Sequence, residues 1–337
     1  MSVDPALIEM MDAVFGDYRE KHASSTTVER DPDLWRQLDE LGLVRLTGSE
    51  ERGGSGAGWF EAAELLAAAA RHGVRIPLAE HDLLACWLLE VGGVPTDDAV
   101  RTVCVLNKDG LADDVPWAGK ADRVVIGWRA DGGYRVADVA AEELTITSGA
   151  NLIGEPRDTV AADVAALQGM PVALGVITQL RLKSGLVRSI QVCAALDRIL
   201  QLCIEHVASR VQFGRPLSKF QAVQNLVSDI AAEAALARAA TEAALAVGAT
   251  SNWSADNLGF LVAVARSCAG HAASVVVRNA HQVLGAIGTT REHRLHEFTR
   301  AALAWRSEFG STRYWDDQVT DSALYASAGG LWGLITG

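Results

Sequence analysis

The sequence lacks any surplus of basic residues. Its 337 residues include 30 Lys and Arg against 42 Asp and Glu, which gives a formal net charge of −12 at pH 7. An acidic chain is a poor ligand for phosphate backbones and for anionic lipid surfaces. The charge therefore argues against nucleic acid or a membrane surface as the main partner. It leaves room for a local basic pocket that holds a small phosphorylated molecule.

The sequence also lacks a cysteine framework. Its five cysteines are scattered, odd in number and without a CxxC pair. This pattern predicts reduced, buried thiols in a cytoplasmic protein rather than disulfides. His293 and His296 are three residues apart, as two metal ligands on a helix can be, but no third ligand lies nearby in the sequence. We therefore expect this pair to lie on a solvated helix face and expect no metal site.

Neither a signal peptide nor a convincing membrane span is evident. The N-terminal stretch MSVDPALIEMMDAVF contains Asp4 and Glu9 and has no basic residue before its apolar positions. The longest charge-free apolar-rich run covers residues 164–180 and is interrupted by Gln168 and Pro171. These features predict a soluble, cytoplasmic protein.

Hydrophobic periodicity divides the chain into three regions and predicts a mostly α-helical protein with a small β domain. Residues 1–95 form an N-terminal helical domain in this interpretation. Residues 96–168 contain short β-branched and aromatic runs separated by turn signals such as Asp131-Gly132-Gly133, which predicts a middle β-barrel-like domain. Residues 169–337 contain long helical periods with short connections, which predicts a C-terminal four-helix bundle.

Capping and turn residues sharpen several of these elements. In the first region Asp31 caps a helix that has Pro32 in its first turn, and Gly73 ends another. The helices expected there cover residues 5–20, a segment that starts at Pro32, residues 59–72 and residues 79–91. The strands expected in the second region cover residues 100–106, 123–128, 134–139 and 144–147.

The helices expected in the third region are long. Apolar residues from Leu186 to Val207 recur every three or four positions, which is the period of a helix seam in a bundle. Further helices are expected over about 217–246, where alanines allow close helix approach, and over about 254–284. Thr289 and Glu292 have capping-box spacing for a fourth helix.

Composition and period alone define no active site, since the sequence has no catalytic triad, Walker loop or GxGxxG motif. Two segments carry a resemblance instead. The segment RVQFGRPLSKFQAVQ at 210–224 resembles the R-x-x-F-G-x-x-L-x-x-x-Q-x-x-Q segment that joins two bundle helices in acyl-CoA dehydrogenases. HQVLGAIG at 281–288 is similar to the Q-x-x-G-G-x-G segment of that family, and RGGSG at 52–56 is a weaker match to its N-terminal Gly-rich loop. The resemblance is strong over 175–300, modest over 30–95 and poor over 96–170.

The resemblance implies an FAD-dependent oxidoreductase of lipid metabolism that desaturates an acyl-CoA thioester at its α and β carbons. In the family these two segments reach across a dimer interface to the flavin held mainly by the neighbouring subunit. An Arg offers a bidentate fork to a pyrophosphate, and a Gln offers a neutral donor. The FAD-contacting role is carried over to Arg210, Gln212, Phe213, Gln282 and Gly285.

Each of these residues also has a plainer interpretation. Arg210 is then a helix-end arginine and Gln282 caps a turn; only the occurrence of both motifs in this order favours a flavin-type fold. Gln221 and Gln224 are interpreted as surface or interface residues. Four tryptophans on helical faces are expected in the core: Trp35, Trp59, Trp87 and Trp305.

The family reaction needs a carboxylate base, and the sequence departs from the family at its first known position. That position is a Glu-Gly-Thr after the fourth bundle helix. When the family Arg on that helix is matched to Arg300, Phe309 occupies the place of the Glu. Glu308 lies one residue early, which is a rotation of roughly 100° on a helix. Glu308 serves as base only if the register slips.

The second known base position, near the start of the first bundle helix, matches about Ser184. Lys183 and Arg188 lie close to it, and no carboxylate is within one turn. We therefore expect no catalytic residue in this chain.

Contacts to a subunit's own flavin are reduced as well. The family's T-E-P-x-A-G-S-D stretch corresponds to residues 105–122, where the hydroxyl and Gly-Ser pattern is missing. Ala286 replaces the second Gly of the pair, and Arg313 stands where the family has a flavin-contacting Gln. The motifs that act on a neighbour's flavin are thus retained, whereas those that act on the chain's own flavin are lost.

This asymmetry suggests the non-catalytic, β-type subunit of a bacterial heteromeric α2β2 acyl-CoA dehydrogenase. A paralogous subunit supplies the base and most of the flavin pocket, the acyl group is steroid-derived or otherwise bulky, and electron-transferring flavoprotein is the family acceptor. One alternative is a self-sufficient flavoenzyme with a relocated base, such as Glu308, or with oxidase or monooxygenase chemistry. Another is a flavin-free binding or scaffold protein of the same fold.

Overall fold

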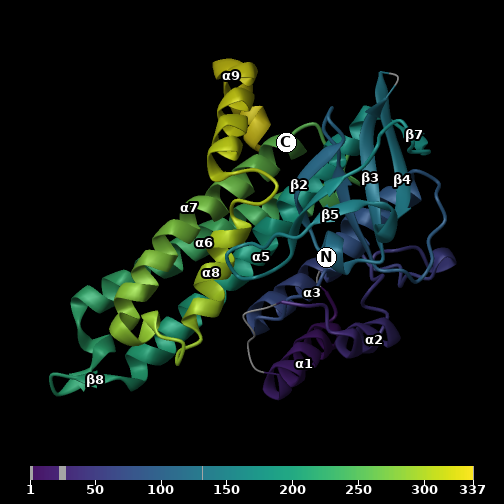
Figure 1. Ribbon diagram of the computed structural model, residues 1–337. Helices are drawn as coiled ribbons and strands as arrows, with labels where there is room; N and C mark the ends of the chain where they lie inside the picture. Colours follow the sequence, from purple (N-terminus) through teal and green to yellow (C-terminus); the bar gives the residue numbers. More distant parts are fainter. Residues whose placement is uncertain (1–2, 23–27, 131, 337) are drawn as a thin grey trace. The chain divides into compact units, whose positions relative to one another are not determined.

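The computed structural model describes residues 3–22, 28–130 and 132–336, and the chain packs as two compact units (Figure 1). Unit 1 contains the chain up to Ala69 together with Val74–Ser184. Unit 2 contains Ala70–Gly73 and Gly185–Gly337. Mostly helical structure with small sheets confirms the expected fold class. Asp131, part of a predicted turn, lies outside the described residues.

The helices of the first region begin and end where capping chemistry predicts. The side chain of Asp31 accepts the backbone N–H groups of Asp33 and Leu34 at 2.9 and 3.1 Å. Gly73 has φ +73°, a conformation that favours glycine, and ends its helix as expected. The helices are α1 Pro5–Lys21, α2 Pro32–Glu40 and α3 Trp59–His72.

The helix expected over 79–91 is present but is not uniform. Its first part, η2 Ala79–Cys86, is a π-helix, and only Trp87–Val91 is the α-helix α4. Every residue of η2 is buried, including three ionisable side chains. A π-helix often marks a special environment, and hydrophobic periodicity does not distinguish it from an α-helix.

The strands of unit 1 form two sheets with one apolar core between them. The first sheet has the order β1-β3-β4-β7, in which β1 and β3 are parallel and the other pairs antiparallel. The second is antiparallel with the order β2-β6-β5. Buried residues from both sheets, such as Val124 and Val160, share the core. The strands are β1 Arg101–Val105, β2 Leu111–Pro116, β3 Arg123–Ala130, β4 Gly133–Ala140, β5 Thr145–Thr147, β6 Arg157–Ala161 and β7 Met170–Val172.

Three of these strands, β2, β6 and β7, have no counterpart among the predicted ones. The sequence of β2, LADDVP, contains two aspartates and a proline, and its pairing with β6 shifts register between Ala112 and Val115. Strand β7 has only three residues and includes Pro171. Such strands are set by their partners rather than by their own alternation, so periodicity does not reveal them.

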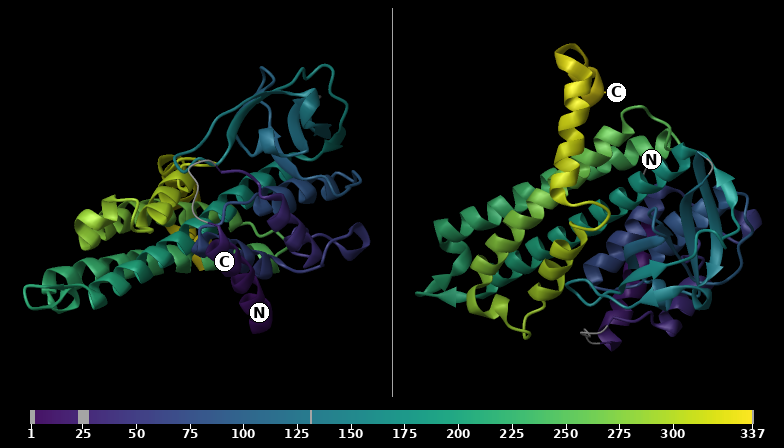
Figure 2. Two further views of the ribbon diagram at one scale, coloured as in Figure 1. Left: turned by 60° about the horizontal axis from the view of Figure 1, so that its bottom comes forward. Right: turned by 45° about the horizontal axis from the view of Figure 1, so that its top comes forward.

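Unit 2 is built from long helices (Figure 2). The seam on α5 is confirmed, because Leu186, Ile190, Cys193 and Leu196 are all buried. Small residues of α6 such as Ala237 are buried, as close helix approach requires. The helices are α5 Leu174–Ser209, whose first residues belong to unit 1, α6 Gln221–Thr250, α7 Leu258–Leu284, α8 Leu295–Trp305 and α9 Thr312–Thr336.

Two predicted helix starts are wrong. Residues Leu217–Lys219 form a separate 3-10 turn, so α6 begins only at Gln221. The capping box at Thr289 and Glu292 does not form: the hydroxyl of Thr289 donates to the carbonyl of Ala286, and α8 begins at Leu295. The Thr289 hydroxyl, which the spacing predicts to cap a helix, is instead bonded to a carbonyl within the 3-10 turn that follows α7.

One described helical segment, Leu258–Thr289, is long and apolar enough to cross a membrane, and half of its apolar window is buried inside the structure. The core helices of soluble proteins have the same length and composition. The five cysteines are free thiols, four of them buried and Cys268 half-buried, as the sequence predicts.

Candidate functional site

The first motif forms a tight hairpin between α5 and α6. Strands β8 Val211–Gln212 and β9 Arg215–Pro216 pair, and Phe213 and Gly214 between them have φ +51° and +78°. Two positive φ values in a two-residue loop define a type I′ turn, which explains why a glycine follows the phenylalanine. The turn leaves Phe213 90% exposed at the tip.

Arg210 of this motif is exposed, and the side chain of Gln212, two residues along the chain, holds its guanidinium. With the Gln212 amide oriented to satisfy both groups, its oxygen accepts from Nε of Arg210 at 3.2 Å and from Nη2 at 2.8 Å. Two of the five guanidinium N–H donors are used in this way. Gln212 therefore orients Arg210, while the other donors of the fork are available to an anion.

The second motif lies at the C-terminal end of α7. Gln282 is an exposed residue of the last turn, and Gly285 ends the helix with φ +59° and ψ −139°. A Cβ added to Gly285 would meet no atom within 4 Å. The backbone at this position is open to close approach by a ligand or by a neighbouring chain.

The structure places both motifs at the same end of unit 2 (Figure 1). His206, on the last turn of α5, and His293, in the segment that follows the second motif, lie edge to face with ring centroids 6.4 Å apart. Burial is the largest cause that lowers the pKa of His206, and the charges of His293 and Arg210 lower it further. The end of the bundle is thus locally basic in a chain of net charge −12.

His293 is not a helix residue, which corrects the expectation of a shared helix face for His293 and His296. Because α8 begins at Leu295, His293 precedes the helix, and its Nδ1 accepts the backbone N–H of Leu295 at 3.1 Å. Both imidazoles are half-buried. Among the described residues, no three His, Cys, Asp or Glu side chains are grouped in a way that could hold a metal ion.

The first base position lies in the connection between α8 and α9. Phe309 occupies it with φ +53°, followed by Gly310 with φ +115°. The neighbouring Glu308 accepts a bond from Nε of Arg188 at 2.7 Å, and the Arg188 side chain is only 1% exposed. Proton abstraction by Glu308 would leave that buried guanidinium without this counter-charge, at a large free-energy cost. The ion pair makes Glu308 a structural group.

A second buried arginine, Arg266 of α7, fixes this connection. Its Nη2 donates to the backbone carbonyls of Arg306, Glu308 and Gly310 at 2.9, 2.8 and 3.1 Å. These carbonyls follow the C-terminus of α8, where a cation is favoured by the helix dipole. Burial lowers the pKa of Arg266 to about 9, and the charge of Arg188 adds to the effect. The only sequence signal for this role is an arginine inside the apolar stretch LVAVARSCAG.

The second base position contains a serine beside a buried lysine, in place of a carboxylate. Ser184 is buried, and its hydroxyl donates to the carbonyl of Leu180 at 2.8 Å. The adjacent Lys183 is 2% exposed, and its Nζ lies 4.6 and 4.5 Å from the ring centroids of Trp59 and Trp87. Burial lowers the pKa of Lys183 to about 7, against the opposing charge of Asp82.

The four tryptophans expected in the core have two different outcomes. Trp35 and Trp305 are buried, as predicted. Trp59 and Trp87 are half-buried, and each presents a ring to the Lys183 ammonium. Their positions depend on a cation–π arrangement that the helical period does not encode.

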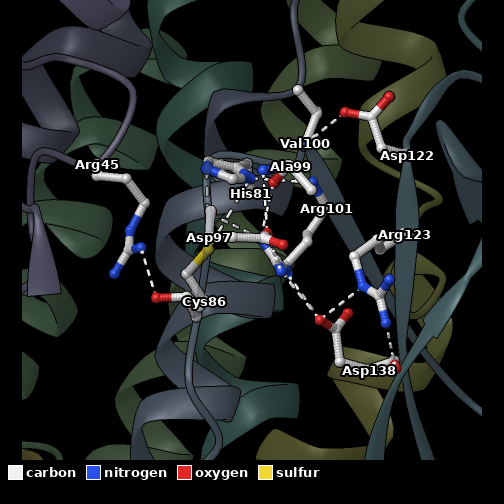
Figure 3. Close-up of polar contacts among 11 residues, drawn as sticks. Arg45, His81, Cys86, Asp97, Ala99, Val100, Arg101, Asp122, Arg123 and Asp138 are labelled. Carbon is white, nitrogen blue, oxygen red and sulfur yellow. Dashed lines mark hydrogen bonds and ion pairs between the residues drawn. The ribbon is translucent and has the colours of Figure 1, made fainter.

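A further polar network lies between η2 and β1 (Figure 3). His81 is 2% exposed, and its Nδ1 accepts the backbone N–H of Arg101 at 3.0 Å. Burial lowers the pKa of His81 to about 3, helped by the charges of Arg45 and Arg101. Arg101 in turn donates to Asp138 at 3.0 Å. The imidazole is neutral and its acceptor nitrogen is already used, so His81 supports the fold.

The comparisons with known proteins agree with this geometry. The sequence matches the acyl-CoA dehydrogenase N-terminal domain over residues 6–96 and the acyl-CoA dehydrogenase C-terminal domain over residues 168–323. The chain belongs to the acyl-CoA dehydrogenase family. Members of this family are FAD-binding oxidoreductases that act on a CH–CH bond.

Particular relatives come from mycobacteria. The chain is 28% identical over 297 residues to acyl-CoA dehydrogenase IpdE2 of Mycolicibacterium smegmatis, an alignment that covers 84% of this chain and 88% of the relative. It is 26% identical over 333 residues to acyl-CoA dehydrogenase FadE27 of Mycobacterium tuberculosis, which covers 87% and 88% of the two chains.

Two solved structures with the same fold are heteromeric by their descriptions. One is the ChsE4–ChsE5 complex from Mycobacterium tuberculosis, with a TM-score of 0.82 and 22% identity over 95% of this chain and 98% of that one. The other is a variant of the Tcur3481–Tcur3483 steroid acyl-CoA dehydrogenase, with a TM-score of 0.84 and 20% identity over 96% and 98%.

The residues of this chain fit FAD at one of the two surfaces where the family would require it. Arg210, Gln282 and the open backbone at Gly285 offer a cationic fork, an amide and close approach. The stretch that would hold the chain's own flavin ring does not fit. There Trp117 is buried with φ +62°, and the N–H of Gly119 donates to the carboxylate of Asp158 at 2.7 Å.

Proposed function

We propose that this chain is the non-catalytic subunit of a heteromeric FAD-dependent acyl-CoA dehydrogenase, and that a paralogous subunit supplies the catalytic base. One observation carries the proposal. Arg210 is exposed at one end of unit 2, whereas the carboxylate next to the first base position, Glu308, is paired with the buried guanidinium of Arg188. In this chain most of the residues matched to flavin contacts are exposed, and neither base position has a carboxylate that is free to accept a proton. Both features suit a subunit that completes the flavin site of another subunit.

Within the complex, the residues of this chain bind and orient. The flavin, when bound, supplies the acceptor for the hydride of the acyl group. Arg210 pairs with the pyrophosphate as a charged fork that Gln212 holds, and Phe213 covers the adjacent surface from the hairpin tip. Gln282 offers an amide, and Gly285 lets the backbone approach. The partner's carboxylate removes the α-proton.

An exposed apolar surface supports an assembly. The second half of α9 projects from the other helices of unit 2 (Figure 2), and Leu324, Tyr325 and Trp332 there are 75, 95 and 73% exposed. Leu324 and Tyr325 precede a break in the helix at Ser327, which has φ +58° and ψ 176°, and Trp332 follows it. Exposed apolar side chains mark an interaction site. The occupant that this proposal commits to is the paralogous subunit, because the fold matches chains of heteromeric dehydrogenases over nearly its whole length.

The proposal extends to an α2β2 heterotetramer, a steroid-derived or other bulky acyl-CoA as substrate, and electron-transferring flavoprotein as electron acceptor. One of the matched structures is described as a steroid dehydrogenase, and another solved structure of this fold is described as an electron transferring flavoprotein. The free thiols support a reducing, cytoplasmic location.

The decisive test expresses the chain alone and together with each acyl-CoA dehydrogenase paralogue from the same genome. Flavin absorbance and its bleaching by acyl-CoA are recorded for each preparation. The proposal expects flavin and bleaching only in the co-expressed complex. Stoichiometric flavin with bleaching in the chain alone would establish a self-sufficient enzyme, and a complex without flavin would favour the scaffold alternative.

A further inference from the structure

The end of unit 2 that carries Arg210 also carries two histidines that neither motif includes. The carbonyl of His206 accepts the backbone N–H of Arg210 at 2.9 Å, so the two residues lie one helical turn apart, and the charge of Arg210 acts on the His206 imidazole. His293 meets it edge to face, with 6.4 Å between the ring centroids. The histidine pair connects the α5–β8 segment with the stretch that follows Gly285, and therefore connects the two motifs.

The surroundings of the pair are mostly basic. His206 faces Arg210 and His293, and His293 faces His296 and Glu205. The Glu205 carboxylate is 62% exposed and lies 3.4 Å from Nη1 of Arg198, so it is a shared and weak counter-charge. Burial, followed by these repulsions, lowers the pKa of both imidazoles below the usual value for histidine.

The tautomer of His293 makes it a donor. Its Nδ1 accepts the backbone N–H of Leu295 at 3.1 Å, so in the neutral ring the proton lies on Nε2. A neutral Nε2–H donates one hydrogen bond, and Nδ1 takes up no proton while it accepts the Leu295 N–H. Two imidazoles beside an arginine are thus prepared for an anion with several acceptor oxygens.

We propose that His206 and His293 form one pyrophosphate-binding surface with Arg210, in which His206 takes up a proton when the anion binds and His293 donates from its neutral Nε2–H. The proposal rests on the proposed function, in which the pyrophosphate belongs to a flavin dinucleotide held mainly by the partner subunit. The anion supplies the counter-charge that the pair lacks, which strengthens each N–H···O bond and favours the imidazolium of His206. Proton uptake makes the affinity for the anion increase as the pH falls.

The test uses the full chain with its histidine ring carbons labelled and inorganic pyrophosphate as the probe. The rings are titrated with pH by NMR, with and without pyrophosphate, and assigned with His206→Gln and His293→Gln. Pyrophosphate is expected to raise the pKa of the His206 ring by about half a unit or more and to shift the ring-carbon resonances of His293 without protonating it. His271, whose Nε2 lies 3.0 Å from the Asp316 carboxylate, is the internal control and should not respond.

A second measurement is calorimetric and compares pyrophosphate binding at pH 6 and pH 8. At pH 6 the wild-type chain and His271→Gln should bind pyrophosphate several-fold more tightly than the His206→Gln/His293→Gln variant does. At pH 8 the difference in affinity between these proteins should be smaller. ADP as a second probe should produce the same ring response if the site accepts the diphosphate of a nucleotide; a response to pyrophosphate alone would overturn its assignment to a dinucleotide.

Unchanged rings at His206 and His293, or equal responses from all eight histidines, would overturn the proposal. The ring titration of the wild-type chain decides the matter even if the double variant fails to fold. Neither measurement needs the partner subunit or acyl-CoA, so a negative result in either one does not change the outcome of the co-expression test. In the same way, a negative co-expression result would not alter the ring response to pyrophosphate.

Discussion

At the scale of single residues, three basic side chains share a type and differ in role because their environments differ. Arg210 is exposed, Arg266 is 1% exposed and bonded to three carbonyls, and Lys183 is enclosed by two indoles. Sequence motifs single out only the exposed one, which we propose acts on the flavin of a neighbouring subunit. The other two become visible only when long-range packing brings their partners close.

Arg210→Ala should weaken flavin retention in the heteromeric complex by about 1.5–3 kcal/mol, the range for a hydrogen bond to a charged group. Flavin content after serial dilution measures the change. Arg36→Ala is the control, because Arg36 is exposed and pairs with Asp33 in α2. If Arg210→Ala retains as much flavin as Arg36→Ala, the assigned pyrophosphate contact is wrong.

His81 should make the fold sensitive to acid. Its pKa is about 3 in the folded chain against an ordinary value of 6.5, so between these values the unfolded chain binds a proton that the folded chain does not. Stability contributed by the neutral ring is therefore lost as the pH falls below 6.5, by up to about 1.4 kcal/mol per pH unit. Urea unfolding at pH 5 and pH 7 should show a smaller pH difference for His81→Gln than for wild type or His271→Gln. An equal difference in all three proteins would contradict this account.

At the scale of elements, the α8–α9 connection shows how a reactive position becomes a structural one. Two arginines on α5 and α7 converge on this short connection, and one of them binds the carboxylate while the other binds the carbonyls. The positive φ of Phe309 and Gly310 is maintained by these contacts. The connection can therefore retain its family shape without the family's carboxylate.

Glu308→Gln should lower the free energy of unfolding by about 3–5 kcal/mol, because it leaves Arg188 buried without its counter-charge. Arg188→Met combined with Glu308→Gln should recover much of the loss. Chemical denaturation of the full chain measures both, with Glu51→Gln in the exposed 3-10 turn Glu50–Arg52 as the control. Equal stability of Glu308→Gln and the control would show that the ion pair contributes nothing to the fold.

The elements that the sequence predicts are those whose signals are local. Asp31 caps its helix and Gly73 ends another because each acts on backbone groups within a few residues. The seam on α5 is equally direct, since burial on a bundle helix follows period. Strand β2 and the start of α8 were missed or misplaced because a distant strand and a neighbouring 3-10 turn determine them.

The candidate site also combines features that local sequence encodes with features that depend on distant residues. The hairpin between α5 and α6 was not predicted, although the Phe-Gly pair suits its I′ turn. The two motifs do predict which residues face a neighbour. The pairing of Glu308 with Arg188, 120 positions apart in the chain, is not encoded in any window of sequence. Family register predicted that Glu308 was displaced, and only the structure shows what it binds.

At the scale of the whole molecule, buried ionisable groups should make stability depend on pH. Lys183 has a pKa of about 7 in the folded chain against an ordinary value of 10.5, so between these values the unfolded chain binds the extra proton. Stability should therefore rise as the pH increases above 7. The rise should be absent in Lys183→Met and retained in Lys120→Met, whose exposed ammonium pairs with Glu29.

Urea unfolding at pH 7 and pH 8.5 measures this effect, and comparison with Lys183→Met cancels the contribution of the cysteines, which begin to ionise in the unfolded chain within this range. The wild-type difference between the two conditions should exceed that of Lys183→Met by about 1–2 kcal/mol, the value of roughly one pKa unit. Identical pH dependence of the two proteins would mean that Lys183 is as protonated in the folded chain as in the unfolded one.

The net charge of −12 and the basic end of unit 2 belong to one description of the assembly. The acidic net charge disfavours polyanions in general, while one end of unit 2 concentrates Arg210, His206 and His293, where we propose that a pyrophosphate binds. The net charge of the whole chain therefore argues against polyanionic partners, and the local basic cluster predicts binding of a small anion.

The central claim is that the base which removes the α-proton lies outside this chain. The most direct test measures acyl-CoA-dependent flavin bleaching, under anaerobic conditions and at low temperature, in purified folded complexes that carry wild-type chain or Glu308→Gln. The account predicts bleaching rates equal within about twofold, since Glu308 binds Arg188 and takes no part in proton abstraction. A loss of 100-fold or more in a complex that retains its flavin would place the base in this chain and contradict the account.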